Sequence, residues 1–509
     1  MAIIGSLIKG VIDLSGSLSG EKNPIKTQEN QLRNLLDRAR NTAFGKHYNF
    51  EEILASDDVM KSFSETVPFF DYNKINSEWW YKMHEGEDDV TWPGKPPYFA
   101  RSSGTTGKSS KRIPVTDEMI ESIRQTGLKQ VASLKNYDLP SDFFEKEIMM
   151  LGSSTFLNQK KDHQEGEISG ISASQIPFWF RNFYKPGKEI AQIEDWDERV
   201  LAIAKEAPNW DIGALTGIPS WIELMMKKVI EYHNLKNIHE IWPNLRVFSS
   251  GGVAFETYEK SFNELLAHPI TIIDTYLASE GFLAFQSRPE TTAMKLVLDN
   301  GIYFEFVPFK QKYINEDGSL KQDSPIVSMA EVKADEDYVL VISTVSGAWR
   351  YIIGDTIKFT DVERKEIKIT GRTKFFMNVL GEQLSVNKMT DAVRDLEDQF
   401  NITIPEFTIS AIKKPDGFYH KWYLGVEGEA DDQSLAAALD AFLKQYRSFR
   451  SARGKALKGV EVVSIPPNVF YEWSGMNKKK GGQVKMEKMM QQEKFEEWEK
   501  FVESQVQKS

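Results

Sequence analysis

Residues 101–116 gather more phosphate-binding groups than any other stretch of the chain. Their sequence, Arg-Ser-Ser-Gly-Thr-Thr-Gly-Lys-Ser-Ser-Lys-Arg-Ile-Pro-Val-Thr, holds two glycines, four serines, three threonines and four basic residues. Flexible glycine backbone exposes N–H groups, hydroxyls donate hydrogen bonds and the basic side chains supply positive charge, which together suit a polyphosphate. We therefore expect a phosphate-binding loop here.

The neighbouring residues predict that this loop connects two strands. Residues 107–109, Gly-Lys-Ser, match the second half of the P-loop motif, but Ser102 stands where its first glycine belongs and no helix begins directly afterwards. Residues 98–100 have strand character, and Pro114 disfavours helical backbone at the residue before it. A P-loop NTPase is therefore disfavoured. The alternative to a phosphate loop is a solvated Ser/Gly hairpin without a ligand.

The composition is that of a folded protein with several domains. The 509 residues are 41% hydrophobic and 27% charged, which is ordinary for a globular chain, and the length suggests roughly two to four domains. The net charge of −11 gives no overall basic field, so we expect no nucleic-acid partner, and a polyanion must bind locally. No apolar run reaches the roughly 18 residues of a membrane span, and the N-terminus has no charged segment before its apolar stretch. We therefore expect a cytoplasmic protein without membrane contact.

The absence of cysteine excludes several kinds of site and reaction. Without cysteine the chain has no disulfide, zinc–thiolate site or cysteine nucleophile, and thioester chemistry would need an external thiol. The seven histidines include no H-E-x-x-H motif or comparable pair on one helical face. We expect them to be surface or core residues rather than metal ligands.

Strands alternate with helices through the first 370 residues. Helical spacing occurs at 27–44, 117–134 and 196–207, and again after the stretch 212–221 in a helix that runs through residue 232. Strand character occurs at 147–152, 245–252, 270–276, 301–308, 338–344 and 350–359. This alternation predicts an α/β domain whose β-sheets are covered on their faces, with ligands at the strand ends. Gly354 and Asp355 are expected at a turn between strands. Trp79, Trp80, Tyr81 and Trp92 form an aromatic cluster that we assign to the core.

The remaining chain predicts a separate small α+β domain. Strand character at 407–412, 422–426 and 460–463 is combined with a helix at 432–449. A last helix places Phe495, Trp498, Phe501 and Val502 on one face. We place the domains at 1–370 and 371–509.

Six short motifs, in order along the chain, resemble the signature of adenylate-forming enzymes, which activate a carboxylate as acyl-AMP. They are Ser-Ser-Gly-Thr-Thr-Gly-Lys at 102–108, Ser-Gly-Gly at 250–252, Tyr-Leu-Ala-Ser-Glu-Gly at 276–281, Tyr-Ile-Ile-Gly-Asp at 351–355, Gly-Arg-Thr-Lys at 371–374 and Gln-Val-Lys at 483–485. Within that superfamily the chain resembles the auxin-responsive acyl acid amido synthetases of plants and their bacterial relatives. Residues 376–384, Phe-Met-Asn-Val-Leu-Gly-Glu-Gln-Leu, suggest the bacterial branch.

The resemblance implies a large ATP- and acyl-binding domain and a small mobile C-terminal domain, with ATP and Mg²⁺ as cofactors. It assigns the nucleotide to Ser102, Ser103, Gly104, Thr105, Thr106, Lys108, Gly251, Gly252, Val253, Tyr276, Ser279, Asp355 and Arg372. Within this set Tyr276 would stack on the adenine, and Asp355 would accept from both ribose hydroxyls. Glu280 would hold Mg²⁺, a cation that prefers carboxylate and phosphate oxygens. From the residues alone, Glu280 also fits an exposed turn and Asp355 a Gly-Asp hairpin.

Lys485 resembles the catalytic lysine of the mobile domain that reaches the α-phosphate, with the lysines at 478, 479 and 480 as alternatives. The chain departs from the family pattern at Ile352, which stands where an arginine is usual, and Arg350 is a possible replacement. The resemblance places the acyl acid against Ile218 and Trp221, with Ser153 or Ser154 opposite.

The implied function is ATP-dependent ligation of a small carboxylic acid to an amino acid through an acyl-adenylate. One alternative is an acyl- or aryl-CoA ligase with coenzyme A as the acceptor, and another is a non-catalytic nucleotide-binding protein. The sequence leaves the acid, the amine and the choice between monomer and dimer open.

Overall fold

The computed structural model describes residues 23–102, 111–176, 181–252, 255–315, 319–373, 376–377, 384–428, 430–446, 449–450, 453, 457–476, 486–490 and 492–506. The chain forms two compact units. The large unit comprises the chain up to Phe255 and then Phe262–Ile369, and the small unit comprises Glu256–Ser261 and Thr370–Ser509. A six-residue segment from the middle of the sequence thus belongs to the small unit.

The large unit begins with a group of short helices. They are α2 (Pro24–Ala39), α3 (Ala43–His47), α4 (Phe50–Ala55), α5 (Val59–Thr66), α6 (Tyr72–Ile75), the π-helical turn η1 (Asn76–Trp80) and α7 (Tyr81–His84). The predicted helix to residue 44 is in fact two helices, because α2 ends at Ala39 and the Thr42 side chain caps α3 through the Gly45 N–H. Trp79, Trp80 and Trp92 are buried, which confirms the aromatic cluster as core for its tryptophans, but Tyr81 is exposed and does not belong to the core.

Among the described residues, the large unit is built around an eleven-stranded sheet with the order β12-β13-β14-β15-β11-β10-β9-β8-β7-β3-β6. Its strands are β3 (Glu147–Leu151), β6 (Tyr184–Lys185), β7 (Ile212–Gly217), β8 (Val247–Gly251), β9 (Thr271–Ala278), β10 (Gly281–Phe285), β11 (Met294–Leu296), β12 (Ile302–Pro308), β13 (Asp337–Thr344), β14 (Tyr351–Asp361) and β15 (Glu366–Arg372). β6, β3, β7, β8 and β9 are parallel neighbours. Their carboxyl ends meet at one side of the sheet, which we call the carboxyl edge, and ligands of open α/β sheets bind at such an edge.

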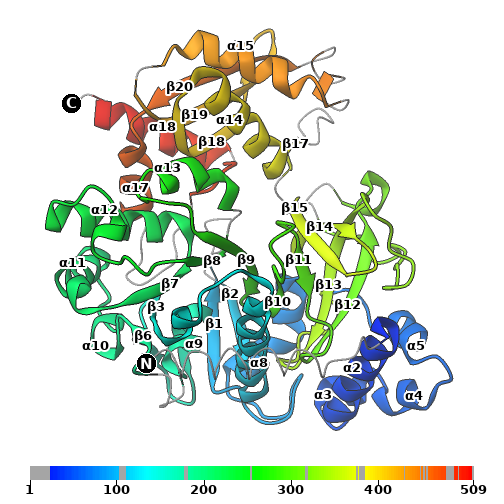
Figure 1. The fold of residues 1–509 in the computed structure, drawn as a ribbon. Coiled ribbons are helices and arrows are strands. Elements are labelled where there is room, and N and C mark those ends of the chain that lie inside the picture. Colours follow the sequence, from blue (N-terminus) through cyan, green and yellow to red (C-terminus); the bar gives the residue numbers. More distant parts are fainter. Residues whose placement is uncertain are drawn as a thin grey trace. The chain divides into compact units, whose positions relative to one another are not determined.

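Helices cover this sheet (Figure 1). They are α8 (Asp117–Ser133), α9 (Ile168–Ser174), α10 (Lys188–Ala191), α11 (Trp196–Glu206) and α12 (Pro219–His233), joined by the short 3₁₀ turns η2 (Leu134–Asn136), η3 (Ser141–Glu145), η5 (Ala207–Asn209), η6 (Ile238–Glu240), η7 (Phe255–Tyr258) and η8 (Gln311–Tyr313). α11 and α12 bury apolar side chains such as Ile203 and Met225 in one cluster with Leu215 of β7 and Phe248 of β8. This helix-covered α/β sheet is the predicted fold class.

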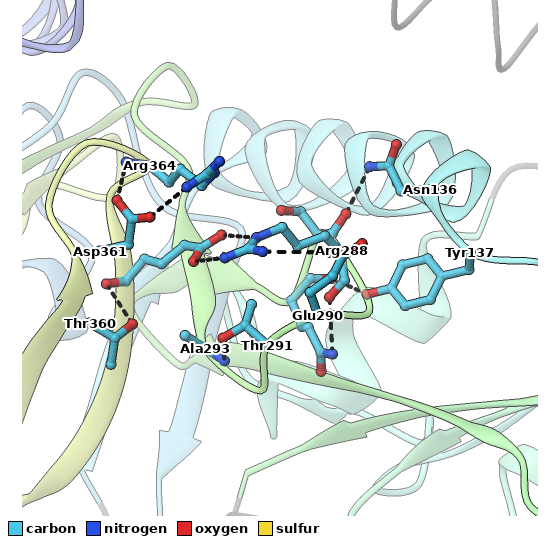
Figure 2. Close-up of polar contacts among 12 residues, drawn as sticks. Asn136, Tyr137, Arg288, Glu290, Thr291, Ala293, Thr360, Asp361 and Arg364 are labelled. Carbon is cyan, nitrogen blue, oxygen red and sulfur yellow. Dashed lines mark hydrogen bonds and ion pairs between the residues drawn. The ribbon is translucent and has the colours of Figure 1, made fainter.

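The sheet curves strongly between β9 and β14. Four strand spacings separate these two strands, which would be roughly 19 Å in a flat sheet. Nevertheless the Tyr276 hydroxyl of β9 donates to the Asp355 carboxylate of β14 at 2.5 Å. At the curve, Arg288 forms two hydrogen bonds of 2.7 and 2.8 Å to the Glu366 carboxylate, as Figure 2 shows. This bidentate pair joins the segment after β10 to the first residue of β15.

A smaller sheet with the order β2-β1-β5-β4 carries the predicted phosphate loop. Its strands are β1 (Tyr98–Ser102), β2 (Lys111–Val115), β4 (Asn158–Gln159) and β5 (Gln164–Gly166). β1 and β2 are antiparallel, with Arg101 opposite Arg112, and β5 pairs in parallel with β1. The prediction of a loop between two strands is therefore confirmed at its ends, while residues 103–110 lie outside the described residues.

The small unit contains a three-stranded sheet with the order β18-β19-β20. Its elements include the hairpin β16 (Phe376–Met377) and β17 (Leu384–Ser385), α14 (Val386–Phe400), β18 (Thr403–Lys414), β19 (Gly417–Glu427), α15 (Asp432–Leu443), β20 (Leu457–Ile465), α17 (Pro467–Met476) and α18 (Gln492–Val506). The four apolar residues predicted on one face of the last helix are all buried. α14 and α17 were not predicted, and the helix expected to reach residue 449 ends at Leu443.

The segment Glu256–Ser261 and the short helix α13 (Glu259–Asn263) extend from the end of β8. Within the small unit, the Tyr258 hydroxyl donates to Glu406 of β18 at 3.0 Å, and Lys260 Nζ donates to the Ile402 carbonyl at 2.5 Å. Lys488 pairs with the other oxygen of Glu406 at 2.6 Å. No helix in the described part of the chain is long and apolar enough to cross a membrane.

Candidate functional site

Tyr276 and Asp355 come from motifs 79 residues apart and meet in a buried hydrogen bond of 2.5 Å. Each side chain is only 6% exposed. Asp355 lies within β14 and not at the predicted turn between strands. Val339 of β13 pairs with Thr356, but Val341 pairs with Ile352, so β14 carries extra residues and bulges here. Gly354 takes a φ of 98°, which glycine adopts without strain, and the bulge directs Asp355 toward Tyr276.

Glu280 occupies the tight turn between β9 and β10, four residues after Tyr276. It is 6% exposed, so the alternative of an exposed turn acid is wrong. Burial, and after it the charge of the nearby Glu280 carboxylate, raise the pKa of Tyr351 well above its usual value. Glu280 therefore lies in the same region as the first residue of β14. Ser279 is the other turn residue.

The Ser-Gly-Gly motif ends β8 at the carboxyl edge, next to β9. Thr275 Oγ1 donates to the Ser250 carbonyl at 2.7 Å. A Cβ on Gly251 would lie 2.8 Å from the same Thr275 oxygen, and Gly252 has a φ of 84°. Both positions thus need glycine, and the exposed backbone is suited to close approach by a flat ring. Val253 lies outside the described residues.

A buried carboxylate joins the two ends of the predicted phosphate loop. Glu165 of β5 is 3% exposed and forms ion pairs with Arg112 of β2 and with Arg101 of β1, the latter at 3.4 Å. His163 Nε2 lies 3.3 Å from the same carboxylate and 3.1 Å from Arg112. Burial opposes ionisation, but His163 and the two arginines together lower the pKa of Glu165. Sequence reasoning named the arginines as part of the loop and missed Glu165.

Nearby, His84 packs against Phe99 of β1 with a ring separation of 4.5 Å. Burial, and then the Arg112 charge, lower the pKa of His84 to about 4. The base of the loop therefore holds a histidine that stays neutral, beside an ionised carboxylate and two cations. Of the loop residues themselves, Ser102 ends β1, and Ser103, Gly104, Thr105, Thr106 and Lys108 lie outside the described residues.

The three residues expected at the acyl acid lie near the carboxyl edge. Ile218 and Trp221 begin α12 directly after β7 and are 6% and 9% exposed. Ser153 follows β3, and its hydroxyl donates to Glu167, which precedes α9. The alternative Ser154 donates instead to the Gln192 carbonyl at 3.1 Å.

Arg199 of α11 also lies near this edge, and sequence reasoning missed it. Trp196 of the same helix packs on Trp221 with a ring separation of 5.0 Å, and the Arg199 guanidinium lies 5.4 Å from the Trp196 ring centre. The signal in the sequence was an arginine within the apolar face that Trp196, Val200 and Ile203 form.

Arg350, the possible replacement for the arginine missing at position 352, is bound inside the fold of the large unit. Its Nε donates to Glu305 at 3.1 Å, and its Nη1 donates to the carbonyls of Ser64, at 2.7 Å, and of Val67. The side chain is 3% exposed and stacks on Phe69 at 4.1 Å. Arg350 therefore joins the N-terminal helices to the large sheet through Nε and Nη1, while its buried Nη2 has no hydrogen-bond partner among the described residues.

The remaining predicted residues lie in the small unit. Arg372 is the exposed last residue of β15, and Lys485 with its three alternatives lies outside the described residues. After that gap, Met486 is buried, and the Thr408 hydroxyl of β18 donates to the Glu487 carbonyl at 2.7 Å. The chain directly following Lys485 is thus fixed on β18.

The large unit therefore gathers the donors and acceptors that a nucleotide needs. Asp355 offers a carboxylate for hydroxyls, the Gly251 backbone offers a flat approach, and Glu280 offers a buried carboxylate for a hard cation. These residues fit ATP and Mg²⁺.

The fold resembles solved adenylate-forming enzymes. A structure of the GH3.15 acyl acid amido synthetase matches with a TM-score of 0.77 at 16% identity, covering 97% of this chain and 96% of that one. A structure of 2-hydroxyisobutyryl-CoA ligase, in the postadenylation state with 2-HIB-AMP, matches with a TM-score of 0.55 at 14% identity, covering 95% and 92%. The fold is thus that of the adenylate-forming enzymes, as the motifs implied.

Comparison of the sequence with models of protein families identifies the family of this chain. The GH3 family N-terminal domain matches residues 18–205, its central domain residues 295–372 and its C-terminal domain residues 387–494. The jasmonoyl-L-amino acid synthetase JAR6 of Nicotiana attenuata is 22% identical over 487 residues, covering 81% of each chain. The chain belongs to the GH3 family, which confirms the resemblance to acyl acid amido synthetases.

Proposed function

We propose that this protein is an ATP-dependent ligase that activates a small carboxylic acid as an acyl-adenylate and transfers the acyl group to an amino acid. The hydrogen bond between Tyr276 and Asp355 carries the proposal, because it brings two distant nucleotide motifs together in one buried place. The GH3 membership and the amido synthetases among the relatives support the amide product.

In the first step the acid carboxylate attacks the α-phosphorus of ATP, and pyrophosphate leaves. Asp355 would accept from the ribose hydroxyls, and the backbone at Gly251 and Gly252 would lie along the adenine. The loop at 102–108 would donate to the phosphates, and Glu165 would keep Arg101 and Arg112 fixed at its base. Catalysis then rests on positioning and on neutralising the negative charge that spreads over the phosphate oxygens.

Glu280 would hold Mg²⁺, which would supply positive charge to the phosphate oxygens. Lys485 of the small unit would donate to the α-phosphate during this step. In the second step the small unit would move, withdraw Lys485 and open a path for the amine to the acyl carbonyl. AMP is then the leaving group, so no protein nucleophile is needed.

The test is pyrophosphate release from Mg²⁺-ATP with a panel of aryl, indolyl and alkyl carboxylates, followed by mass spectrometry of the products formed with mixed amino acids and coenzyme A. We expect release that depends on the carboxylate, and an amide product. A thioester would instead establish a CoA ligase, an alternative that the structural match to 2-hydroxyisobutyryl-CoA ligase favours. ATP binding without release for any acid would indicate a non-catalytic nucleotide-binding protein.

Glu280 gives a specific prediction about the metal. Replacing Glu280 with Gln removes the buried charge but keeps the side-chain shape, so the Mg²⁺ concentration for half-maximal pyrophosphate release should rise about tenfold or more. Glu290→Gln, at an exposed carboxylate of the same unit (Figure 2), is the control and should leave this concentration unchanged. An unchanged metal requirement in Glu280→Gln would remove Glu280 from this role.

A further inference from the structure

Arg199 is a buried cation without a hydrogen-bonded anion. Arg199 is 5% exposed, and its Nε has no hydrogen-bond partner among the described residues. In the described part of the chain no carboxylate lies within ion-pair distance of its guanidinium, and the charges of Glu167 and Asp195 act on it only through space. Burial lowers the pKa of Arg199 despite these charges.

This state of Arg199 is unusual in a folded protein. An arginine leaves water only at a large cost in free energy, which an ion pair or a set of hydrogen bonds normally offsets. The same unit shows the normal case, since Arg350 is 3% exposed and is bound by Glu305 and by backbone carbonyls. At Arg199 the compensation among the described residues consists of the face of Trp196 and of through-space attraction to Tyr184, Glu167 and Asp195. Each of these is weaker than a carboxylate in direct contact. The missing acceptor is therefore expected to come from a ligand.

The location of Arg199 indicates which ligand would supply this acceptor. Arg199 lies in the first turn of α11, and Trp196 of that turn contacts Trp221, which begins α12 just beyond the carboxyl end of β7. The nucleotide residues lie at the neighbouring strands β8 and β9. An acid activated beside β8 and extending along the carboxyl edge toward β7 and β3 would direct its far end to Trp221 and Arg199.

We propose that Arg199 binds a second carboxylate at the far end of the acyl acid, so that the substrates are dicarboxylic acids. This inference rests on the proposed ligase function and names its substrate class. A guanidinium provides two parallel N–H donors that match the two oxygens of a carboxylate. The tryptophan faces beside it suit a short apolar or aromatic spacer between the two acid groups. The first carboxylate is activated, and the second stays ionised on Arg199.

The experiment compares each dicarboxylic acid with the monocarboxylic acid of the same length, in pyrophosphate release without any amine. For the wild-type protein we expect kcat/KM to be at least tenfold higher for the diacid than for the monoacid. Arg199→Met should lose this preference because its KM for the diacid rises. Its kcat/KM for the monoacid should stay at the wild-type value. Arg199→Lys should restore part of the preference. Arg246→Met, at an exposed arginine that precedes β8 at the opposite edge, is the matched control and should behave as wild type.

A binding measurement separates this inference from the proposed function. Diacids, but not matched monoacids, should raise the thermal midpoint of the wild-type protein, and Arg199→Met should abolish this shift while its own midpoint is equal or higher. This arm needs no catalysis, so it tests Arg199 even if no acid supports pyrophosphate release. If monoacids and diacids give equal pyrophosphate release and equal shifts of the thermal midpoint, the inference is overturned and the ligase function stands.

A second source of the same chemistry is the α-carboxylate of the amino acid acceptor. If Arg199→Met leaves diacid preference unchanged, and instead abolishes the discrimination between an amino acid and its amide in the second step, the carboxylate belongs to the acceptor. That result would also overturn the assignment to the acyl acid.

Discussion

At the scale of single residues, the site depends on carboxylates held where water is excluded. Asp355, Glu280 and Glu165 are each nine-tenths or more buried, and each lies at a turn, a bulge or a loop base. A carboxylate in such a place is costly unless it has a partner. Asp355 and Glu165 have theirs in Tyr276 and in a pair of arginines, which keeps both carboxylates in position before a ligand binds.

Asp355→Asn should weaken the use of ATP. The substitution replaces a charged acceptor with a neutral one, and a hydrogen bond to a charged group contributes about 1.5–3 kcal/mol, so kcat/KM for ATP should fall roughly 10- to 100-fold. Pyrophosphate release measured against ATP concentration gives this value. Tyr276→Phe keeps the ring and loses only the hydroxyl, so its effect should be smaller. An unchanged ATP dependence in Asp355→Asn would contradict the ribose assignment.

Glu397 of α14 should make the small unit less stable as the pH rises. Burial raises the pKa of Glu397 from 4.5 to about 7, and the Ile404 N–H and nearby Lys260 only partly offset it. Between these two values the folded state holds a proton that the unfolded state has lost, so stability falls as the pH rises through the window and the full cost is present above about 7. The variant Glu397→Gln should therefore gain in thermal midpoint over wild type at pH 8 but not at pH 4.5. Equal differences at both pH values would contradict this.

At the scale of elements, the curve of the large sheet brings together Tyr276 and Asp355, the two residues proposed to bind the nucleotide. Arg288 and Glu366 join the two sides of that curve. Arg288→Gln should lower the thermal midpoint by several degrees, because Glu366 is 2% exposed and would keep its charge without a partner. It should also weaken ATP use, since Tyr276 and Asp355 lie on strands on either side.

The control for Arg288→Gln is the variant Arg364→Gln, at a residue that Figure 2 also labels. Arg364 pairs with Asp361 in an exposed turn (Figure 2), and an exposed pair contributes little to stability. Arg364→Gln should therefore leave both the thermal midpoint and ATP use near wild-type values. If the two variants lose equally, the pair at Glu366 has no special role in holding the curve.

Sequence patterns predicted many of the longer elements of the large unit within a few residues, and missed most of the short ones. Strand and helix periodicity located β3, β8, β9, α8 and α12 because these elements bury one regular set of side chains. The bulge in β14 was not predictable, since it depends on the mismatch with β13, and Gly-Asp alone also fits a turn. Arg199 was missed for a related reason: whether an arginine in an apolar face has a partner is decided by residues far away in the sequence.

At the scale of the whole molecule, the proposed reaction needs the small unit in the first step more than in the second. Lys485→Ala should reduce carboxylate-dependent pyrophosphate release about 100-fold, in line with the loss of one donor to a developing anion. Amide formation from supplied acyl-adenylate should change far less. Lys480→Ala is the comparison variant, because the sequence alone left both lysines open. Equal losses in the two half-reactions would reject the assignment of Lys485.

The segment Glu256–Ser261, which belongs to the small unit, has a consequence for the construction of chimeras between this protein and its relatives. These six residues are encoded well before the rest of the small unit, yet Tyr258 and Lys260 are bonded to Glu406 and to the Ile402 carbonyl. A chimera that exchanges only residues 370–509 would import a β18 surface evolved against a different hexapeptide. The small unit of this chain is thus discontinuous in the sequence, and a functional graft has to carry both pieces together.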